Sequence, residues 1–391
     1  MKYFPRVLSS INDESLFCLK TRNSLLQLKY GQSVLKFYKQ HADVNSWFKN
    51  ICAQSDIPFA VEEINETEDS ENSFYIAADV KQIKYLLSES ERLNQAAFAQ
   101  LKMAEAAVNN YSREYSLDKD NFSFIKPNKT SIMGILNITP DSFSDGGEYF
   151  DEDKAIERAE SITAEGADIL DVGGQSSRPG AESISPDEEM RRVIPIINKI
   201  SSRVNIPVSI DTYRSEVAWE ALQAGASMIN DISALTFDEK MTEVAAKKGC
   251  PVVLMHMQGS PLTMQKNPYY ESVCDEIFQF LYKKCEYAKI NGIEEGNIII
   301  DPGIGFGKSV LHNLEILKEL ESFRSLGYPV LVGTSRKFFI GSILDLPVYD
   351  RLEGTLSSVV LCSLRRASIV RVHDVKEVKR AVMIVNEIMK A

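Results

Sequence analysis

The chain has 391 residues, of which 44% are hydrophobic and 25% charged, a composition typical of globular proteins and unlike that of collagen-like, low-complexity or disordered chains. Its 55 acidic residues outnumber the 44 Lys and Arg, so the net charge is -11, which excludes the extended basic surface of a general nucleic-acid-binding protein. Any anion that this protein binds must be held by a local cluster of cations.

Cysteine usage and apolar runs indicate the compartment. The six cysteines are scattered, without a C-x-x-C pair or a zinc-finger spacing, and are expected to be reduced thiols. The first residues lack the apolar stretch of a signal peptide, and no apolar run approaches the roughly 18 residues of a membrane span. These features predict a cytoplasmic protein that does not bind membranes.

Residues 1–128 are expected to form a small α+β module that ends in a linker. Gly31 is the one glycine of this region, and an acidic run at 62–71 predicts a solvated loop. The predicted elements are strands at 33–38 and 73–78, a helix at 89–115 and a polar linker at 118–129. No motif of known chemistry occurs in this module, so its role stays open.

Residues 129–391 are expected to form a second domain, in which short apolar runs alternate with longer amphipathic stretches. This alternation predicts a parallel sheet covered by helices, and eight such units match an α/β fold of the (β/α)8 TIM-barrel type. A doubly wound open sheet is the structural alternative. The predicted strands are 132–136, 168–170, 207–210, 227–229, 251–255, 297–300, 329–332 and 368–370.

Polar residues stand at or just beyond the end of every predicted strand. A barrel gathers all eight carboxyl ends around one mouth, where active sites of this fold are built. A single Asp or Asn can simply cap the following helix, but capping is a poor account of a ring that includes Lys, Arg and His. The ring consists of Asn137, Asp171, Asp211, Asn230, His256, Asp301, Thr334 with Lys337, and Arg371 with His373.

Three loops add to this pattern. Loops 137–147 and 171–180 are rich in hydroxyls, Gly and Pro, as is typical of mobile loops that close over a ligand. The glycine-rich segment 303–309 does not match a P-loop, because Pro302 stands where that motif requires glycine. Its glycines are expected to turn the backbone around Phe306, and Lys308 is expected to be solvent-facing or structural.

Loops 137–147 and 171–180 and five further motifs resemble the dihydropteroate synthase family, over roughly residues 131–391. The resemblance implies a (β/α)8 barrel, usually dimeric, that uses Mg2+. It also implies the condensation of 6-hydroxymethyl-7,8-dihydropterin pyrophosphate with p-aminobenzoate, which releases pyrophosphate and 7,8-dihydropteroate in folate biosynthesis. The further motifs are Ile229–Ile232, Met255–Gly259, Asp301–Lys308, Ser335–Lys337 and Arg371–Asp374.

The resemblance assigns roles to particular residues. Those implied at the pterin are Asp211, Asn230, Ile232, Met255, Asp301, Phe306 and Lys337, and those at p-aminobenzoate are Phe143, Ser177, Pro179 and Phe306. Asn137, Arg178, Arg371 and His373 are implied at the pyrophosphate, with Asn137 holding Mg2+. The implied catalytic set is Lys337, Arg371, His373, Asp145 and Arg178.

The residue chemistry fits these roles. Carboxylates and an amide deep in an apolar barrel can pair with the polar edge of a pterin, since buried polar groups require partners. Arg371 and His373 alternate on one strand, so both face the same side of the pleat and can bind phosphate oxygens.

Two departures from the family pattern concern p-aminobenzoate. Ser177 stands where Thr is usual, and Phe338 where Ser or Arg often follows the lysine.

Two rival functions are a methyltetrahydrofolate:corrinoid methyltransferase and a non-catalytic paralogue. The cations Arg178, Arg371 and His373 argue against the first rival, which needs no pyrophosphate clamp, and the intact motifs argue against the second.

Overall fold

The computed structural model divides the chain into two compact units. The first comprises Met1–Arg113 with Glu321–Gly327, and the second Glu114–Leu320 with Tyr328–Ala391. The residues that the structure describes are 4–10, 17–20, 25–28, 32–40, 42–62, 72–119, 122–139, 152–175, 184–261 and 263–390. Within these ranges, no helix has the length and apolar character needed to cross a bilayer.

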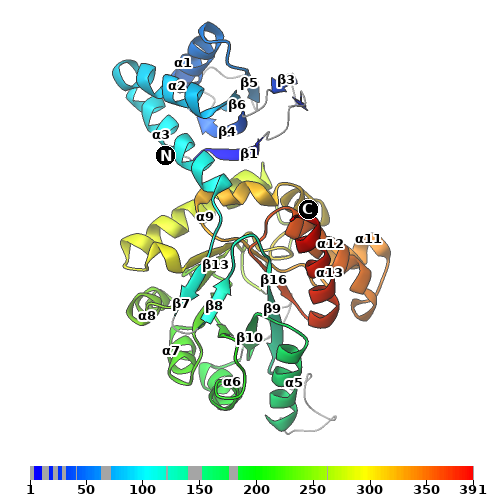
Figure 1. Cartoon of the computed structure of the whole chain (residues 1–391). Helices are drawn as coiled ribbons and strands as arrows, with labels where there is room; N and C mark the ends of the chain where they lie inside the picture. Colours follow the sequence, from blue (N-terminus) through cyan, green and yellow to red (C-terminus); the bar gives the residue numbers. More distant parts are fainter. Residues whose placement is uncertain are drawn as a thin grey trace. The chain divides into compact units, whose positions relative to one another are not determined.

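The first unit is built on an antiparallel sheet with the strand order β1-β4-β6-β5 (Figure 1). Its strands are β1 (Arg6–Ser10), β4 (Ser33–Gln40), β5 (Phe59–Glu62) and β6 (Asn72–Ala78), and its helices are α1 (Ala42–Gln54), α2 (Val80–Leu93) and α3 (Gln95–Ser112). A separate two-stranded ribbon joins β2 (Phe17–Lys20) to β3 (Leu25–Leu28). The α+β character and the two strands expected from the sequence are thus confirmed.

An aromatic cluster forms the core of this unit. Phe37 and Phe74 are register partners on β4 and β6, and their rings stack with centroids 4.6 Å apart. Phe48 of α1 lies 4.7 Å from Phe74 and is fully buried. Large buried aromatic side chains of this kind supply much of the stability of a small domain.

The helix expected over 89–115 is interrupted. Asn94 adopts an extended backbone conformation (φ -152°, ψ 95°) between α2 and α3. Its side-chain oxygen accepts a hydrogen bond from the Ala97 amide at 3.0 Å, which caps the second helix. The helical periodicity of the sequence continues across this position, whereas the local cap breaks the backbone.

The first unit is discontinuous in sequence. Within it, Arg6 Nη1 donates to Ser322 Oγ at 2.9 Å, and the Val7 amide donates to Ser325 Oγ at 3.0 Å. Arg324 Nε donates to the carbonyl of Tyr111 at 3.3 Å. A boundary drawn near residue 128 therefore differs from the compact units, which divide the chain after Arg113 and assign Glu321–Gly327 to the first unit.

The second unit is a parallel (β/α)8 barrel, as predicted. Its eight-stranded sheet has the order β14-β13-β12-β11-β10-β9-β16-β15, and a parallel bridge between Ile300 and Val330 joins the two end strands. This closure excludes the open doubly wound sheet. The strands are β9 (Ser131–Asn137), β10 (Ile169–Gly173), β11 (Val208–Asp211), β12 (Met228–Asp231), β13 (Val252–Met255), β14 (Ile298–Asp301), β15 (Leu331–Val332) and β16 (Ile369–Val372).

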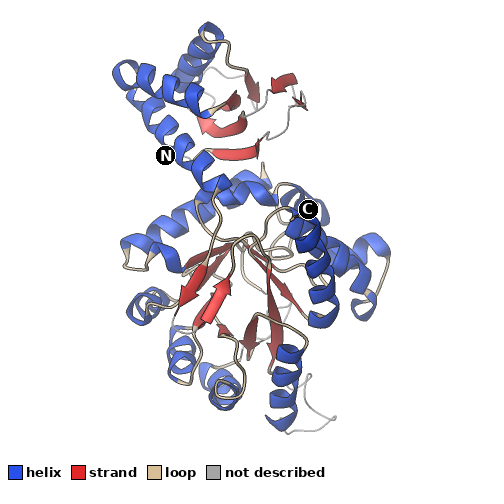
Figure 2. Ribbon diagram, viewed as in Figure 1, coloured by secondary structure: helices blue, strands red, loops and turns tan. Residues whose placement is uncertain are grey.

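Helices surround these strands, as Figure 2 shows. They are amphipathic and bury one face, as Val193, Ile196 and Ile200 of α6 illustrate. The helices are α5 (Glu152–Ala164), α6 (Pro186–Ile200), α7 (Ser215–Gln223), α8 (Lys240–Lys248), α9 (Val273–Ile290), α10 (Val310–Lys318), α11 (Phe338–Leu344), α12 (Leu352–Leu364) and α13 (Val375–Ile388).

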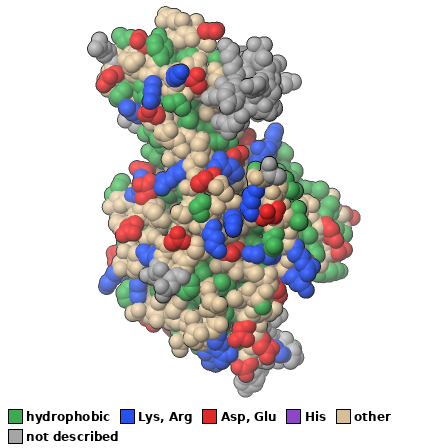
Figure 3. Space-filling model, in the orientation of Figure 1, with side chains coloured by type: hydrophobic (Ala, Val, Ile, Leu, Met, Phe, Trp, Pro, Cys, Tyr) green, Lys and Arg blue, Asp and Glu red, His purple; other side chains and the backbone are tan. Residues whose placement is uncertain are grey.

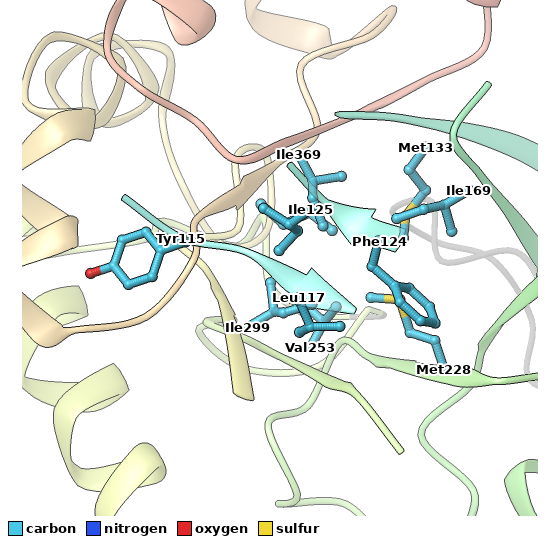
Figure 4. Close-up of a cluster of buried hydrophobic side chains, with 11 residues drawn as sticks. Tyr115, Leu117, Phe124, Ile125, Met133, Ile169, Met228, Val253, Ile299 and Ile369 are labelled. Carbon is cyan, nitrogen blue, oxygen red and sulfur yellow. The ribbon is translucent and has the colours of Figure 1, made fainter. Parts of the chain in front are cut away.

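A hairpin closes the amino-terminal end of the barrel. The segment expected to be a linker contains β7 (Leu117–Lys119) and β8 (Phe122–Ile125), which pair antiparallel. Its side chains Tyr115, Leu117, Phe124 and Ile125 form one buried cluster with Met133, Ile169, Met228, Val253, Ile299, Leu331 and Ile369 of the barrel strands (Figure 4). This apolar floor leaves the carboxyl ends of the strands as the open mouth.

We predict that Phe124→Ala lowers the free energy of unfolding of the barrel by about 3–5 kcal/mol, because the loss of this fully buried ring leaves a cavity within the floor cluster. Denaturant unfolding followed by tryptophan fluorescence or circular dichroism measures the change. Tyr269→Ala, which removes a ring that is 73% exposed, serves as the control and should change stability by less than about 0.5 kcal/mol. Equal effects of both variants would contradict the sealing role of the hairpin.

Candidate active site

The polar residues of the mouth stand two positions after the apolar floor residues on the same strands. Side chains two apart on a strand point to the same face, so both groups face the barrel interior. The pairs of floor and mouth residue are Ile169 and Asp171, Met228 and Asn230, Ile299 and Asp301, and Ile369 and Arg371. The barrel interior is therefore apolar at its closed end and polar at its open end.

An ion-pair network joins three strands at the mouth. Arg371 Nε donates to Asp171 Oδ2, and Arg371 Nη2 donates to Asp211 Oδ2, each at 2.6 Å. Asn230 Nδ2 donates to the same Oδ2 of Asp171 at 3.1 Å. The Asp171 side chain is wholly buried, and the Arg371 side chain is 19% exposed. One cation thus faces two carboxylates, which leaves a net negative charge.

Burial changes the protonation equilibria of this network. Burial raises the pKa of Asp211 from its ordinary value to about 7, although the charge of Arg371 opposes the shift. Burial likewise raises the pKa of Asp301 to about 6, against the hydrogen bond that Asp301 Oδ1 accepts from the Gly303 amide at 2.7 Å. Burial disfavours the charge of Arg371, but Asp171 and Asp211 outweigh it and raise its pKa. These are poorly hydrated acceptors that a ligand with N–H donors can satisfy.

Lys337 enters the same mouth from the start of α11. Its Nζ lies 4.3 Å from the centroid of the Phe306 ring, a cation–π contact. Burial lowers its pKa to about 8; Arg371 adds to the decrease, while Asp301 opposes it. Gly305 has a φ of +83°, and a Cβ there would lie 3.2 Å from Lys337 Cδ, so this position requires glycine.

Apolar side chains form one wall of the mouth. The buried cluster consists of Ile232, Met255, Met264 and Phe306, with Tyr213 and Met257 packed against it. The structure therefore brings together the three apolar residues predicted for the pterin. Met264 was missed, because it lies in an irregular loop between β13 and α9 where no periodicity indicates burial.

Lys308 is buried, so the expectation that it faces solvent is wrong and the structural alternative holds. Its Nζ contacts His256 Nδ1 and the Phe306 carbonyl, each at 2.9 Å. Burial lowers the pKa of Lys308 to about 7, and burial together with Lys308 lowers the pKa of His256 well below its usual value. The pair fixes the glycine-rich loop: at Gly303 (φ +70°) a Cβ would lie 1.9 Å from the His256 carbonyl oxygen. His256 is thus a supporting residue of the loop.

His373 lies two residues after Arg371, just beyond the end of β16, and its ring nitrogen Nδ1 is 3.0 Å from Ser335 Oγ. The backbone amide of His373 donates to the same oxygen at 3.2 Å, so Ser335 Oγ contacts both the backbone and the ring of this histidine. Burial lowers the pKa of His373 to about 3, with a further contribution from the charge of Arg371. The ring is therefore neutral, with an N–H donor on one of its two nitrogens. Ser335 stands in the Ser335–Lys337 motif, but the sequence does not indicate this contact.

Asn137 and Asp211 meet above Gly173, which pairs with both residues in the sheet. A Cβ at Gly173 would lie 3.5 Å from Asp211 Cβ and 3.8 Å from Asn137 Oδ1, so the absent side chain leaves a small space between two oxygen-bearing groups. The described residues contain no cluster of three His, Cys, Asp or Glu side chains suited to a metal ion.

The remaining predicted site residues lie outside the described part of the chain. They are Phe143, Asp145, Ser177, Arg178 and Pro179, on the loops that follow β9 and β10. The structure brings together the other predicted residues from strands β9, β11–β14 and β16 and from the start of α11.

Comparison with known proteins agrees with this geometry. A family model described as "Pterin binding enzyme" matches residues 133–373. The dihydropteroate synthase of Bacillus subtilis is 47% identical over 273 residues, which cover 68% of this chain and 93% of that protein. The dihydropteroate synthase of Escherichia coli is 43% identical over 260 residues, covering 66% of this chain and 92% of that protein.

A solved structure of similar fold is the Yersinia pestis dihydropteroate synthase in a sulfonamide complex. It has a TM-score of 0.68 and 39% identity, and the match covers 71% of this chain and all of that chain. Xanthomonas albilineans dihydropteroate synthase with 4-aminobenzoic acid has a TM-score of 0.67 at 37% identity, with the same coverage.

We predict that Lys337 titrates near pH 8, more than two units below an ordinary lysine, because burial disfavours its ammonium form. The ammonium is then present below that pH and is lost above it. Carbon NMR titration of lysine ε-methylenes, with Lys337→Arg to assign the signal, measures the value. A Lys337 midpoint at the ordinary value of a lysine side chain would contradict the prediction.

Proposed function

Because the chain belongs to the family of pterin binding enzymes, we propose how its residues divide the work of the dihydropteroate synthase reaction. The enzyme condenses 6-hydroxymethyl-7,8-dihydropterin pyrophosphate with p-aminobenzoate, and it releases pyrophosphate and 7,8-dihydropteroate in folate biosynthesis. The observation that carries the proposed roles is a polar layer above an apolar floor, in which Asp171, Asn230 and Asp301 are buried. Asp211 and Arg371 complete this layer and are largely buried.

The pterin binds in the polar layer. Asp211, Asp301 and the Asn230 oxygen are acceptors for the N–H donors of the ring edge, and the Lys337 ammonium donates to its oxygen and nitrogen atoms. Desolvated carboxylates with raised pKa values gain most from such partners. The buried cluster of Ile232, Met255 and Phe306 supports apolar contact with the ring faces. These contacts permit a single orientation of the ring.

The pyrophosphate binds at the end of β16. The guanidinium of Arg371 supplies charged N–H donors, and the neutral ring of His373, in the tautomer whose Nδ1 accepts from Ser335, supplies an Nε2–H donor. We assign Arg178 to the same group of donors. As the bond between the methylene carbon and the pyrophosphate oxygen lengthens, these donors face the negative charge that develops on the leaving group. Such preorganised electrostatics are typically the largest catalytic contribution.

The donor set fits a Mg2+ ion. Oxygen ligands are those that Mg2+ prefers, and the amide oxygen of Asn137 lies with Asp211 around the space above Gly173. We propose that Asn137 holds the ion together with phosphate oxygens. When bound, Mg2+ neutralises charge on the pyrophosphate.

The second substrate completes the reaction. The aniline nitrogen of p-aminobenzoate forms a bond to the methylene carbon as pyrophosphate leaves, and it then gives up one proton. We propose that Phe143, Ser177, Pro179 and Phe306 form its pocket. Asp145 is proposed as a further catalytic group. A neutral amine attacking an electron-poor carbon needs little general-base assistance, so positioning is the main requirement.

Two statements about the environment of the enzyme are proposals of the same kind. The five cysteines whose side chains the structure describes are buried thiols outside any disulfide, which supports the reducing cytoplasm as its location. Exposed apolar side chains on the packed helices α11, α12 and α13 support a homodimer, since contiguous patches of this kind mark protein interfaces. They are Ile343, Leu344, Leu361, Leu364, Met383, Ile384 and Ile388, and Figure 3 shows hydrophobic side chains gathered where α11 and α12 lie.

We predict that Lys337→Ala and Asp211→Asn each lower turnover by about 10²- to 10³-fold while the chain still folds, because each removes a charged contact to a preorganised ring site. A coupled assay of pyrophosphate release, with and without p-aminobenzoate, measures the rate. Release that does not depend on p-aminobenzoate would argue for a different transfer reaction. Lys240→Ala on the exposed side of α8 is the control and should keep the wild-type rate.

We predict that Ile384→Glu converts the dimer to a monomer, because a carboxylate would have to be buried in an apolar interface. Sedimentation equilibrium of the purified chain measures the mass. Ile290→Glu on α9, also strongly exposed in the single chain, should leave the mass unchanged. A wild-type protein that sediments as a monomer would contradict the proposed homodimer.

A further inference from the structure

Asp171 is the central acceptor of the mouth, yet the reaction roles given above do not use it. Its side chain is wholly buried, and its Oδ2 accepts hydrogen bonds from both Arg371 Nε and Asn230 Nδ2. These two donors are assigned to different parts of the first substrate, Arg371 to the pyrophosphate and Asn230 to the pterin. A single carboxylate oxygen of Asp171 therefore holds one residue that binds each part.

The contact with Asn230 determines which end of its amide faces the ligand. An ionised carboxylate can only accept hydrogen bonds, so the group that Asn230 turns towards Asp171 must be its NH2. The amide oxygen is thereby left for the ligand, beside the acceptors Asp211 and Asp301. Without Asp171 the amide could turn over and present N–H groups to the N–H donors of the pterin edge.

The contact with Arg371 holds the guanidinium in place. Arg371 Nη2 donates to Asp211, which is the carboxylate that we assign to the pterin. When the pterin takes Asp211, the Nε contact to Asp171 can persist and keep the guanidinium in place. Asp171 Oδ1 has no hydrogen-bond partner among the described residues, so it is available to the Nη2 that Asp211 releases. A guanidinium held through Nε and Nη2 on one carboxylate keeps Nη1 free for an anion.

We propose that Asp171 is a positioning residue that orients the Asn230 amide towards the pterin and anchors Arg371 beside the pyrophosphate. The proposal rests on the proposed roles of Asn230 and Arg371 in the synthase reaction. Asp171 itself touches neither the substrates nor the reacting atoms. It acts through the two residues that do.

Calorimetric titration with 6-hydroxymethyl-7,8-dihydropterin tests the first part. Asp171→Asn should lower the affinity for the pterin roughly 10- to 100-fold, because an amide at this position no longer forces the orientation of Asn230. The matched control is Ser209→Ala. Ser209 is the buried register partner of Asp171 on β11, and its hydroxyl has no partner among the described residues, so this variant should bind the pterin like the wild type.

A swap of the two side chains separates positioning from a merely structural role. In the double variant Asp171→Asn with Asn230→Asp, the amide introduced on β10 can donate to the carboxylate introduced on β12, while its oxygen still accepts from Arg371. The carboxylate on β12 then presents an acceptor to the pterin whichever way it turns. The double variant should recover most of the affinity that Asp171→Asn loses. A structural loss caused by Asp171→Asn would not be rescued in this way.

The outcomes are distinct. Unchanged pterin affinity in Asp171→Asn, or no recovery in the swap, overturns the role of Asp171 and leaves the synthase reaction standing. A wild-type chain that releases no pyrophosphate contradicts the proposed function instead. If Asp171→Asn does not fold, a structure of the wild-type chain with the pterin decides the question. Asn230 Nδ2 and Arg371 Nε should both remain within about 3.2 Å of Asp171, and loss of either contact overturns the proposal.

Discussion

The double ion pair of the largely buried Arg371 with the carboxylates of Asp171 and Asp211 is the interaction on which the candidate site depends. Charges removed from water are costly unless they are paired and hydrogen-bonded, and here one cation satisfies groups from two other strands. The pairing joins β10, β11 and β16 at their carboxyl ends. It also leaves an excess of negative charge, which suits a ligand edge rich in N–H donors.

The barrel can bury such a network because its interior side chains change from apolar to polar over two residues of a strand. The hairpin of β7 and β8 closes the amino-terminal end with Phe124 and Leu117, so water cannot enter from below. Two residues further along β10, β12, β14 and β16, the side chains become polar. The resulting desolvation raises the pKa of Asp211 and Asp301 and lowers that of Lys337, so that ligand groups replace water as their partners.

Residues behind the mouth hold the groups that face the ligand. Lys308 and His256 support the loop that carries Phe306, Gly305 provides the space beneath Lys337, and Ser335 directs the ring of His373. Arg336, a non-glycine residue at a φ of +58°, is held by its ion pair with Asp374, with Nε donating to Oδ2 at 3.0 Å. Strain of this kind persists where the surrounding structure over-determines the backbone, as it does at many functional sites.

The sequence by itself determined the eight strands, the barrel and most of the residues at its mouth. Strand periodicity, polar residues at strand ends and the motifs from Ile229–Ile232 to Arg371–Asp374 are local features that can be read residue by residue. Only the tertiary structure decided that Asp171 is the partner of Arg371, 200 residues away, that Lys308 is buried against His256, and that β7 and β8 form a floor and not a linker. The reason is physical: a carboxylate, a lysine or a polar hairpin can be solvated or buried with equal local propensity, and only the long-range contacts of the folded barrel remove it from water and supply its partner.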